Sequence, residues 1–112
     1  MRERPIPPHP GLERRPPPSF GWLDARLLHE GWLGKLGAEP VAVLTLLSLA
    51  ADRHGASFYR RETMAHALSM PRRQLDRSLD RLLELGLVAH RPWMTGHIDG
   101  VWQLLAVPRQ SG

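Results

Sequence analysis

The stretch from Thr63 to Arg91, TMAHALSMPRRQLDRSLDRLLELGLVAHR, decides the fold. Its apolar spacing first predicts a two-turn helix over residues 60–68. Pro71 then interrupts the pattern, because proline disfavours helical geometry in the residue before it and can itself begin a helix. The next helix is predicted over residues 71–85, with Gly86 as its left-handed stop. We therefore expect two helices joined by a tight turn.

The predicted helix 71–85 has two contrasting sides. At about 100° per residue, one side gathers leucines and should face the core. These core-facing positions are Leu75, Leu79, Leu82 and Leu83. Arg73, Arg77 and Arg81 fall on the opposite side at four-residue steps, with Gln74 beside them and Ser78 farther round. The helix is therefore predicted to turn a basic, polar side away from the core.

Helical and strand-like segments flank this pair of helices. Pro40 opens the segment Val41–Ala51, which is apolar almost all round and is predicted to be the buried central helix. Residues 56–59 have the composition of a short strand. Residues 87–91 and 101–107 are predicted to form a β-hairpin with a long tip, because turn-forming residues separate them.

This order of elements resembles the winged helix-turn-helix proteins of bacteria, which include regulators and replication initiators. The resemblance implies a mainly α fold with a small β-hairpin wing, over residues 38–108. Pro71 departs from the family pattern, because Ser or Thr usually caps the recognition helix there. A looser similarity links the chain to small helix-turn-helix proteins of mobile elements. The segments that carry these similarities are Thr63–Leu68, Ser69–Pro71, Gln74–Val88, Leu82–Arg91, Phe20–Leu28 and Ala51–Tyr59.

The resemblance and the basic helix side together predict sequence-specific binding of double-stranded DNA. Arginine and glutamine can each make paired hydrogen bonds to base edges in the major groove, so Arg73 and Gln74 are expected to read bases. Other basic residues are expected to contact the DNA backbone from the helices and from the hairpin. The full predicted contact set is Arg60, Arg61, Arg72, Arg73, Gln74, Arg77, Ser78, Arg81, His90, Arg91 and His97.

Two alternatives compete with direct DNA readout. The arginines of helix 71–85 can instead form ion pairs with Asp76, Asp80 and Glu84 on a solvated helix face. The domain can also serve as a protein-interaction module in a replication or transposition complex. Single-stranded DNA or RNA binding ranks lower, because it calls for exposed aromatic side chains and only Trp93 and Tyr59 suit that role.

Composition is compatible with a single basic domain. The chain has 112 residues with 42% hydrophobic content and a formal net charge of +4, which favours a polyanionic partner. All basic residues except Lys35 are arginine, a bias that a GC-rich genome also produces. There is no cysteine, no apolar run long enough to span a bilayer and no apolar stretch typical of a secretory signal. We expect a bacterial cytoplasmic protein, associated with the nucleoid when bound.

The N-terminal third is predicted to differ from the rest. Residues 1–18 hold most of the 11 prolines and several arginines, so they are expected to be a disordered tail. Such a tail suits a passive leader, a basic arm along DNA or a contact for a protein partner. Residues 19–37 form a helical extension, as one bent helix or two short ones. Its Trp22–Leu36 segment is a candidate homodimer element, or it packs back on its own domain. Residues 109–112 are expected to be disordered.

The sequence predicts no enzyme, cofactor or metal site. His97 and Asp99 lie close together, but two ligands on a loop without a third do not make a zinc site. No glycine-rich phosphate loop or nucleophile elbow is present. Trp93 is expected either to pack under the hairpin tip or to stack on a partner, whereas Trp102 in an alternating strand is expected to belong to the core.

Overall fold

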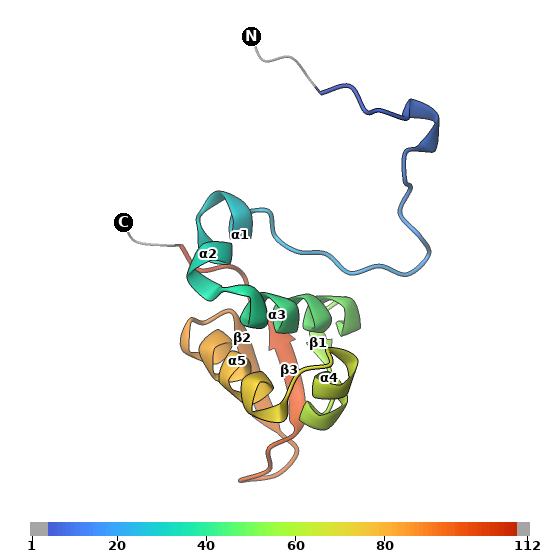
Figure 1. Ribbon diagram of the computed structural model, residues 1–112. Helices are drawn as coiled ribbons and strands as arrows, with labels where there is room; N and C mark the ends of the chain where they lie inside the picture. The colour runs from blue at the N-terminus through green and yellow to red at the C-terminus, as the bar shows by residue number, and fades with distance from the viewer. Residues whose placement is uncertain (1–4, 110–112) are drawn as a thin grey trace.

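The computed structural model describes residues 5–109 of the chain. This part is mixed, with five α-helices and a small three-stranded antiparallel sheet (Figure 1). A single 3-10 turn at Pro10–Leu12 precedes them. The helices are α1 Arg26–His29, α2 Trp32–Leu36, α3 Ala38–Ala50, α4 Arg61–Ala67 and α5 Arg72–Glu84, and the strands are β1 Ala56–Ser57, β2 Val88–Pro92 and β3 Gly100–Leu104. Within the described range, no helix has the length and apolar content needed to cross a bilayer.

Helix α3 is the central helix, as predicted. It follows Gly37, whose φ of +83° is a left-handed value, and it carries Pro40 in its first turn. Both of its hydroxyl side chains hydrogen-bond within the helix: Thr45 donates to the Val41 carbonyl and Ser48 to the Leu44 carbonyl, each over 2.8 Å. These bonds satisfy polar groups that burial would otherwise leave unpaired. The helix can therefore be buried on several sides, against α2, α5 and the sheet.

A tight turn joins α4 to α5. Ser69 adopts a left-handed φ of +49°, and the Met70 amide donates to the Ala65 carbonyl over 2.9 Å. Pro71 keeps an extended ψ of 141°, so the helix begins at Arg72, one residue later than predicted. No side chain caps this helix start with a hydrogen bond.

Helix α5 ends at a glycine, as predicted. Gly86 has a left-handed φ of +75°. This backbone conformation costs glycine little energy, because glycine has no Cβ. The Gly86 amide donates to the Leu83 carbonyl over 3.1 Å, and the Leu87 amide donates to the Leu82 carbonyl over 3.0 Å. This pair of bonds is the Schellman motif, which satisfies the last carbonyls of the helix and directs the chain into β2.

The sheet has the order β1-β3-β2, with antiparallel pairing throughout. His90 of β2 faces Trp102 of β3 in register, and Ser57 of β1 faces Trp102 from the other edge. Gly100, the first residue of β3, lies so close to β2 that a Cβ there would collide with the Arg91 carbonyl oxygen. Only glycine therefore fits at this end of the hairpin. Strand β3 ends at Leu104 rather than at residue 107, so the predicted strand was too long.

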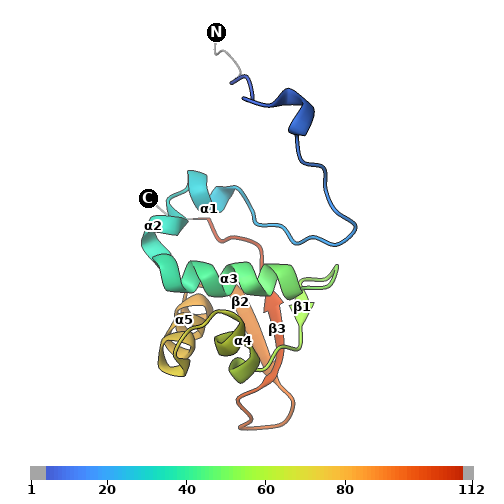
Figure 2. The same cartoon turned by 45° about the vertical axis from the view of Figure 1, so that its right-hand side comes forward.

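The N-terminal helices pack on the same core as the rest. Residues 20–36 contain two short helices rather than one bent helix, and Gly31, with a φ of +78°, separates them. Leu27, Trp32 and Leu36 are buried in the cluster that also holds α3, α5 and the sheet. Residues 5–18 are exposed, and this part of the chain extends away from the helices (Figures 1 and 2). Residues 1–4 of the predicted tail and residues 110–112 lie outside the described residues.

Candidate nucleic-acid interface

Helix α5 separates its leucines from its arginines as the sequence predicts. Leu75, Leu79 and Leu82 are fully buried, with 0% exposure each. Arg73 and Arg77 are exposed on the other side, and Gln74 between them is half-buried. Burial of the leucine side against α3 and the sheet fixes the rotation of the helix about its axis, so the arginines are held outward.

The exposed arginines differ in how far they are neutralised. Within residues 5–109, neither Arg73 nor Arg77 makes an ion pair. Arg72 Nε pairs with Asp76 Oδ1 at 3.1 Å, and Arg81 Nη1 lies 3.9 Å from a Glu84 carboxylate oxygen. Such exposed pairs contribute little stability and break readily for another anion. The alternative of a fully paired helix face therefore holds for Arg72 and Arg81 but not for Arg73 and Arg77.

Arg61 is placed differently from the prediction, which made it a surface contact. Its side chain is only 14% exposed, and Nη1 donates to Asp76 Oδ1 over 2.9 Å. Its Nε donates to the Ile98 carbonyl over 3.2 Å, and its backbone amide donates to Asp99 Oδ1 over 2.9 Å. The guanidinium also lies 5.4 Å from the centre of the Trp102 ring. Arg61 therefore ties α4 to α5 and to the hairpin, through its Nε and Nη1 donors and its backbone amide.

Asp76 is the carboxylate shared by the two arginines. Burial alone would raise the pKa of its carboxyl group, but hydrogen bonds from Arg61 and Arg72, together with their charge, outweigh that effect. The pKa of Asp76 consequently lies below its ordinary value. The side chain stays ionised at neutral pH and holds Arg61 in place.

Two other predicted contacts are turned inward. Ser78 is 3% exposed, because it follows Leu75 by three positions and so shares the leucine side of α5. His90 stacks on Trp102 with ring centres 4.1 Å apart, and its Nε2 is buried without a hydrogen-bond partner. Burial, followed by the nearby charge of Arg61, lowers the pKa of His90 despite the opposing charge of Asp99. Neither side chain faces the surface that carries the α5 arginines. Trp102, in contrast, belongs to the core as predicted, with 1% exposure.

The hairpin tip carries the remaining predicted contacts on its surface. Arg91 and His97 are exposed, and the Trp93 ring, 46% exposed, lies 5.6 Å from the His97 ring. The Arg60 guanidinium sits 5.7 Å from the centre of the Trp93 ring, so it belongs to this cluster as well. Within the described part of the chain, no group of three potential metal ligands occurs.

The predicted contacts thus fall into one outward group and one inward group. The first turns of α4 and α5 and the hairpin tip lie at one end of the molecule in both views (Figures 1 and 2). The outward residues there and along α5 are Arg60, Arg72, Arg73, Gln74, Arg77, Arg81, Arg91 and His97. The inward residues are Arg61, Ser78 and His90.

The network around Arg61 is the feature that the sequence did not indicate. Arg61 and Asp99 are 38 residues apart, and Arg61 and Asp76 are 15 residues apart. Local spacing carries no signal for pairs at such separations. Comparisons of the chain with family models, with curated proteins and with solved structures returned no match.

Proposed function

We propose that this protein binds double-stranded DNA as a winged helix-turn-helix, with α5 as the recognition helix and the β2–β3 hairpin as the wing. The order α3, β1, α4, α5, β2, β3 and the sheet order β1-β3-β2 support this proposal. So does the short turn between α4 and α5, a connection of the kind that joins the two helices of a helix-turn-helix.

The observation that carries the proposal is that Arg73 and Arg77 of α5 form no ion pair with any residue of the described range 5–109. Arg73 and Arg77 project from a helix whose opposite side is anchored by fully buried leucines. Side chains near the start of a recognition helix enter the major groove most deeply, so Arg73 and Gln74 are assigned to base edges. Arg72, Arg77 and Arg81 are assigned to phosphates, because an exposed guanidinium gains a strong partner there at little desolvation cost.

The hairpin tip is assigned to the DNA backbone. Arg60 and His97 lie beside the exposed Trp93 ring, and Arg91 is exposed on the neighbouring strand β2. A wing at this position lies beside the helix and reaches the sugar-phosphate backbone next to the groove that the helix occupies. We assign no base contact to these residues.

Occupancy of a DNA site, rather than catalysis, would be the mode of action. This suits a transcriptional regulator or an accessory factor of a mobile element. A single small module buries limited surface on DNA, so we propose that two copies bind related half-sites.

Salt-dependent binding to duplex DNA tests the proposal. If about four arginines neutralise phosphates, log affinity should fall with log salt concentration at a slope of roughly −3 to −4, as measured by fluorescence anisotropy. Replacing both Arg73 and Arg77 with Gln should weaken binding at least tenfold and flatten the slope by about one unit, since only Arg77 of the two is assigned to a phosphate.

The matched control is Arg26→Gln, which removes an exposed arginine of α1 that pairs with Asp24 at 2.8 Å. We expect the control to change neither the affinity nor the slope by more than a small fraction. If Arg26→Gln weakens DNA binding as much as the replacement of Arg73 and Arg77 does, the binding depends on net charge and not on the α5 surface. No binding at low salt would favour the alternative of a protein-interaction module.

A further inference from the structure

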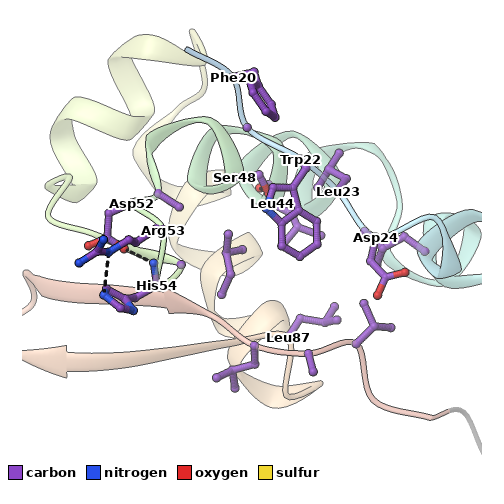
Figure 3. A pocket seen from close by; sticks show the side chains of 18 residues that line it. Phe20, Trp22, Leu23, Asp24, Leu44, Ser48, Asp52, Arg53, His54 and Leu87 are labelled. Atoms are coloured by element: carbon purple, nitrogen blue, oxygen red, sulfur yellow. Dashed lines mark hydrogen bonds between the residues drawn. The ribbon is translucent and has the colours of Figure 1, made fainter. Parts of the chain in front are cut away.

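A cavity of about 510 Å³ lies along the second half of α3, beneath the segment Phe20–Asp24, which we term the strap (Figure 3). Its volume falls within the range typical of small-molecule sites. The floor is apolar and belongs to the core, with Leu27, Leu44, Leu87 and Val107 each at most 8% exposed. Side chains of α3, the loop after α3 and the chain after β3 complete the walls.

The strap approaches α3 very closely at Gly21. At Gly21 a Cβ would collide with the Ser48 carbonyl oxygen, so only glycine permits this approach. The flanking aromatic side chains do not fill the cavity, since Phe20 is 65% exposed and Trp22 is 75% exposed. Trp22 lies over the middle of the cavity (Figure 3). The solvent-exposed Trp22 ring, above an apolar floor, therefore offers a stacking surface to a flat apolar ligand.

The two ends of the cavity differ in charge. At one end the Asp52 carboxylate accepts the His54 amide over 2.8 Å and the Ala56 amide over 3.0 Å, so it is occupied in holding the turn. Those bonds lower the pKa of Asp52. Arg53 beside it donates a hydrogen bond to the His54 ring over 3.3 Å, and its charge contributes to the lowered pKa of Asp52, but within residues 5–109 it makes no ion pair. This end of the cavity therefore presents an available positive charge.

At the other end, the Asp24 carboxylate pairs with Arg26 at 2.8 Å. A second anion gains less there, because Asp24 already neutralises the charge of Arg26. An anionic ligand group is consequently directed to the Arg53 end, with its apolar body lying toward Trp22 and the leucine floor.

We propose that this cavity binds a small aromatic carboxylic acid, with its ring between Trp22 and the buried leucines and its carboxylate on Arg53. The inference goes beyond DNA binding and does not depend on it. Leu87 is part of the floor and follows Gly86, three residues after the end of α5. An occupant would therefore contact the chain just beyond the candidate recognition helix.

Titration calorimetry on the full chain tests the proposal with two probes, 2-naphthoate and its neutral isostere 2-naphthamide. We expect naphthoate to bind with a dissociation constant of roughly 10–300 μM, as ligand efficiency allows for a molecule of its size, and the amide to bind about tenfold more weakly. Arg53→Gln should remove the difference between the probes and leave amide binding unchanged. Trp22→Ala should weaken both probes alike.

Arg60→Gln, immediately before α4 and outside the cavity lining, is the charge-matched control and should bind both probes as the parent does. The proposal is overturned if naphthoate gives no saturable heat at millimolar concentration, or if Arg53→Gln binds it unchanged. It is also overturned if acrylamide quenching, compared between the parent and Trp22→Phe, shows Trp22 shielded without ligand. In that case the indole itself fills the cavity.

Discussion

At the scale of single residues, Arg61 shows how a largely covered arginine can position the proposed DNA-binding surface from behind. Its guanidinium is held by Asp76 of α5 and by the Ile98 carbonyl of the hairpin, and its amide is held by Asp99. These bonds join the candidate recognition helix to the candidate wing. The relative placement of the two surfaces therefore depends on a side chain that is itself largely covered.

This role predicts a distinct effect of Arg61→Gln. The free energy of unfolding should fall by about 1.5–3 kcal/mol, the range for hydrogen bonds to charged groups, as measured by urea denaturation. DNA affinity should also fall, but the salt slope should match that of the parent, because no phosphate contact is lost. Arg77→Gln should do the reverse, flattening the slope by about one unit with little effect on stability. A flattened slope for Arg61→Gln would mean that it does reach a phosphate.

At the scale of elements, the hairpin carries a titratable group inside its packing. His90 of β2 stacks on Trp102 of β3, with Arg61 approaching from α4 and Asp99 from the tip. Its lowered pKa in the folded state means that the unfolded chain binds more protons just below the ordinary histidine value of about 6.5. The stability associated with neutral His90 is therefore present above that value and is lost as the pH falls through it toward the folded pKa.

We expect the thermal midpoint of unfolding, measured by circular dichroism, to be lower at pH 5.5 than at pH 7.5. His90→Phe keeps a ring on Trp102 and removes the titration, so its midpoint should depend less on pH over this interval. His66→Phe is the matched control, since His66 is exposed on α4, and it should keep the pH dependence of the parent. Parallel pH profiles for His90→Phe and the parent would place the titration elsewhere.

The elements also show what could be predicted from the sequence. Helix α5 begins and ends within one residue of its predicted bounds, because its leucine spacing, Pro71 and Gly86 are all local signals. The inward position of Ser78 was available from the same spacing, since Ser78 follows Leu75 by three residues. Burial of Arg61 and His90 was not, because it arises from partners brought together by the fold. The extent of β3 likewise depends on pairing with β2, and composition does not report that pairing.

At the scale of the whole molecule, the N-terminal helices share the core of the rest of the chain. Trp32 is 3% exposed and belongs to one buried cluster with residues of α3, α5 and the sheet. Half of the segment proposed as a dimer element is thus already used within the chain. Trp22, Leu23 and Leu28 remain exposed and are available in this segment to a second copy.

One shared core predicts one cooperative unfolding transition that includes α1 and α2. Trp32→Ala should lower the free energy of unfolding of the whole chain by about 3–5 kcal/mol, because it removes a large buried side chain and leaves a cavity. Trp22→Ala, the same replacement at a ring that is 75% exposed, should change it by no more than about 0.5 kcal/mol. Urea denaturation followed by far-ultraviolet circular dichroism measures both. If Trp32→Ala instead produces a separate transition at low urea while the main midpoint stays unchanged, residues 19–37 form an independent extension. The residues that follow would then hold their fold, and the outward direction of the α5 arginines, without it.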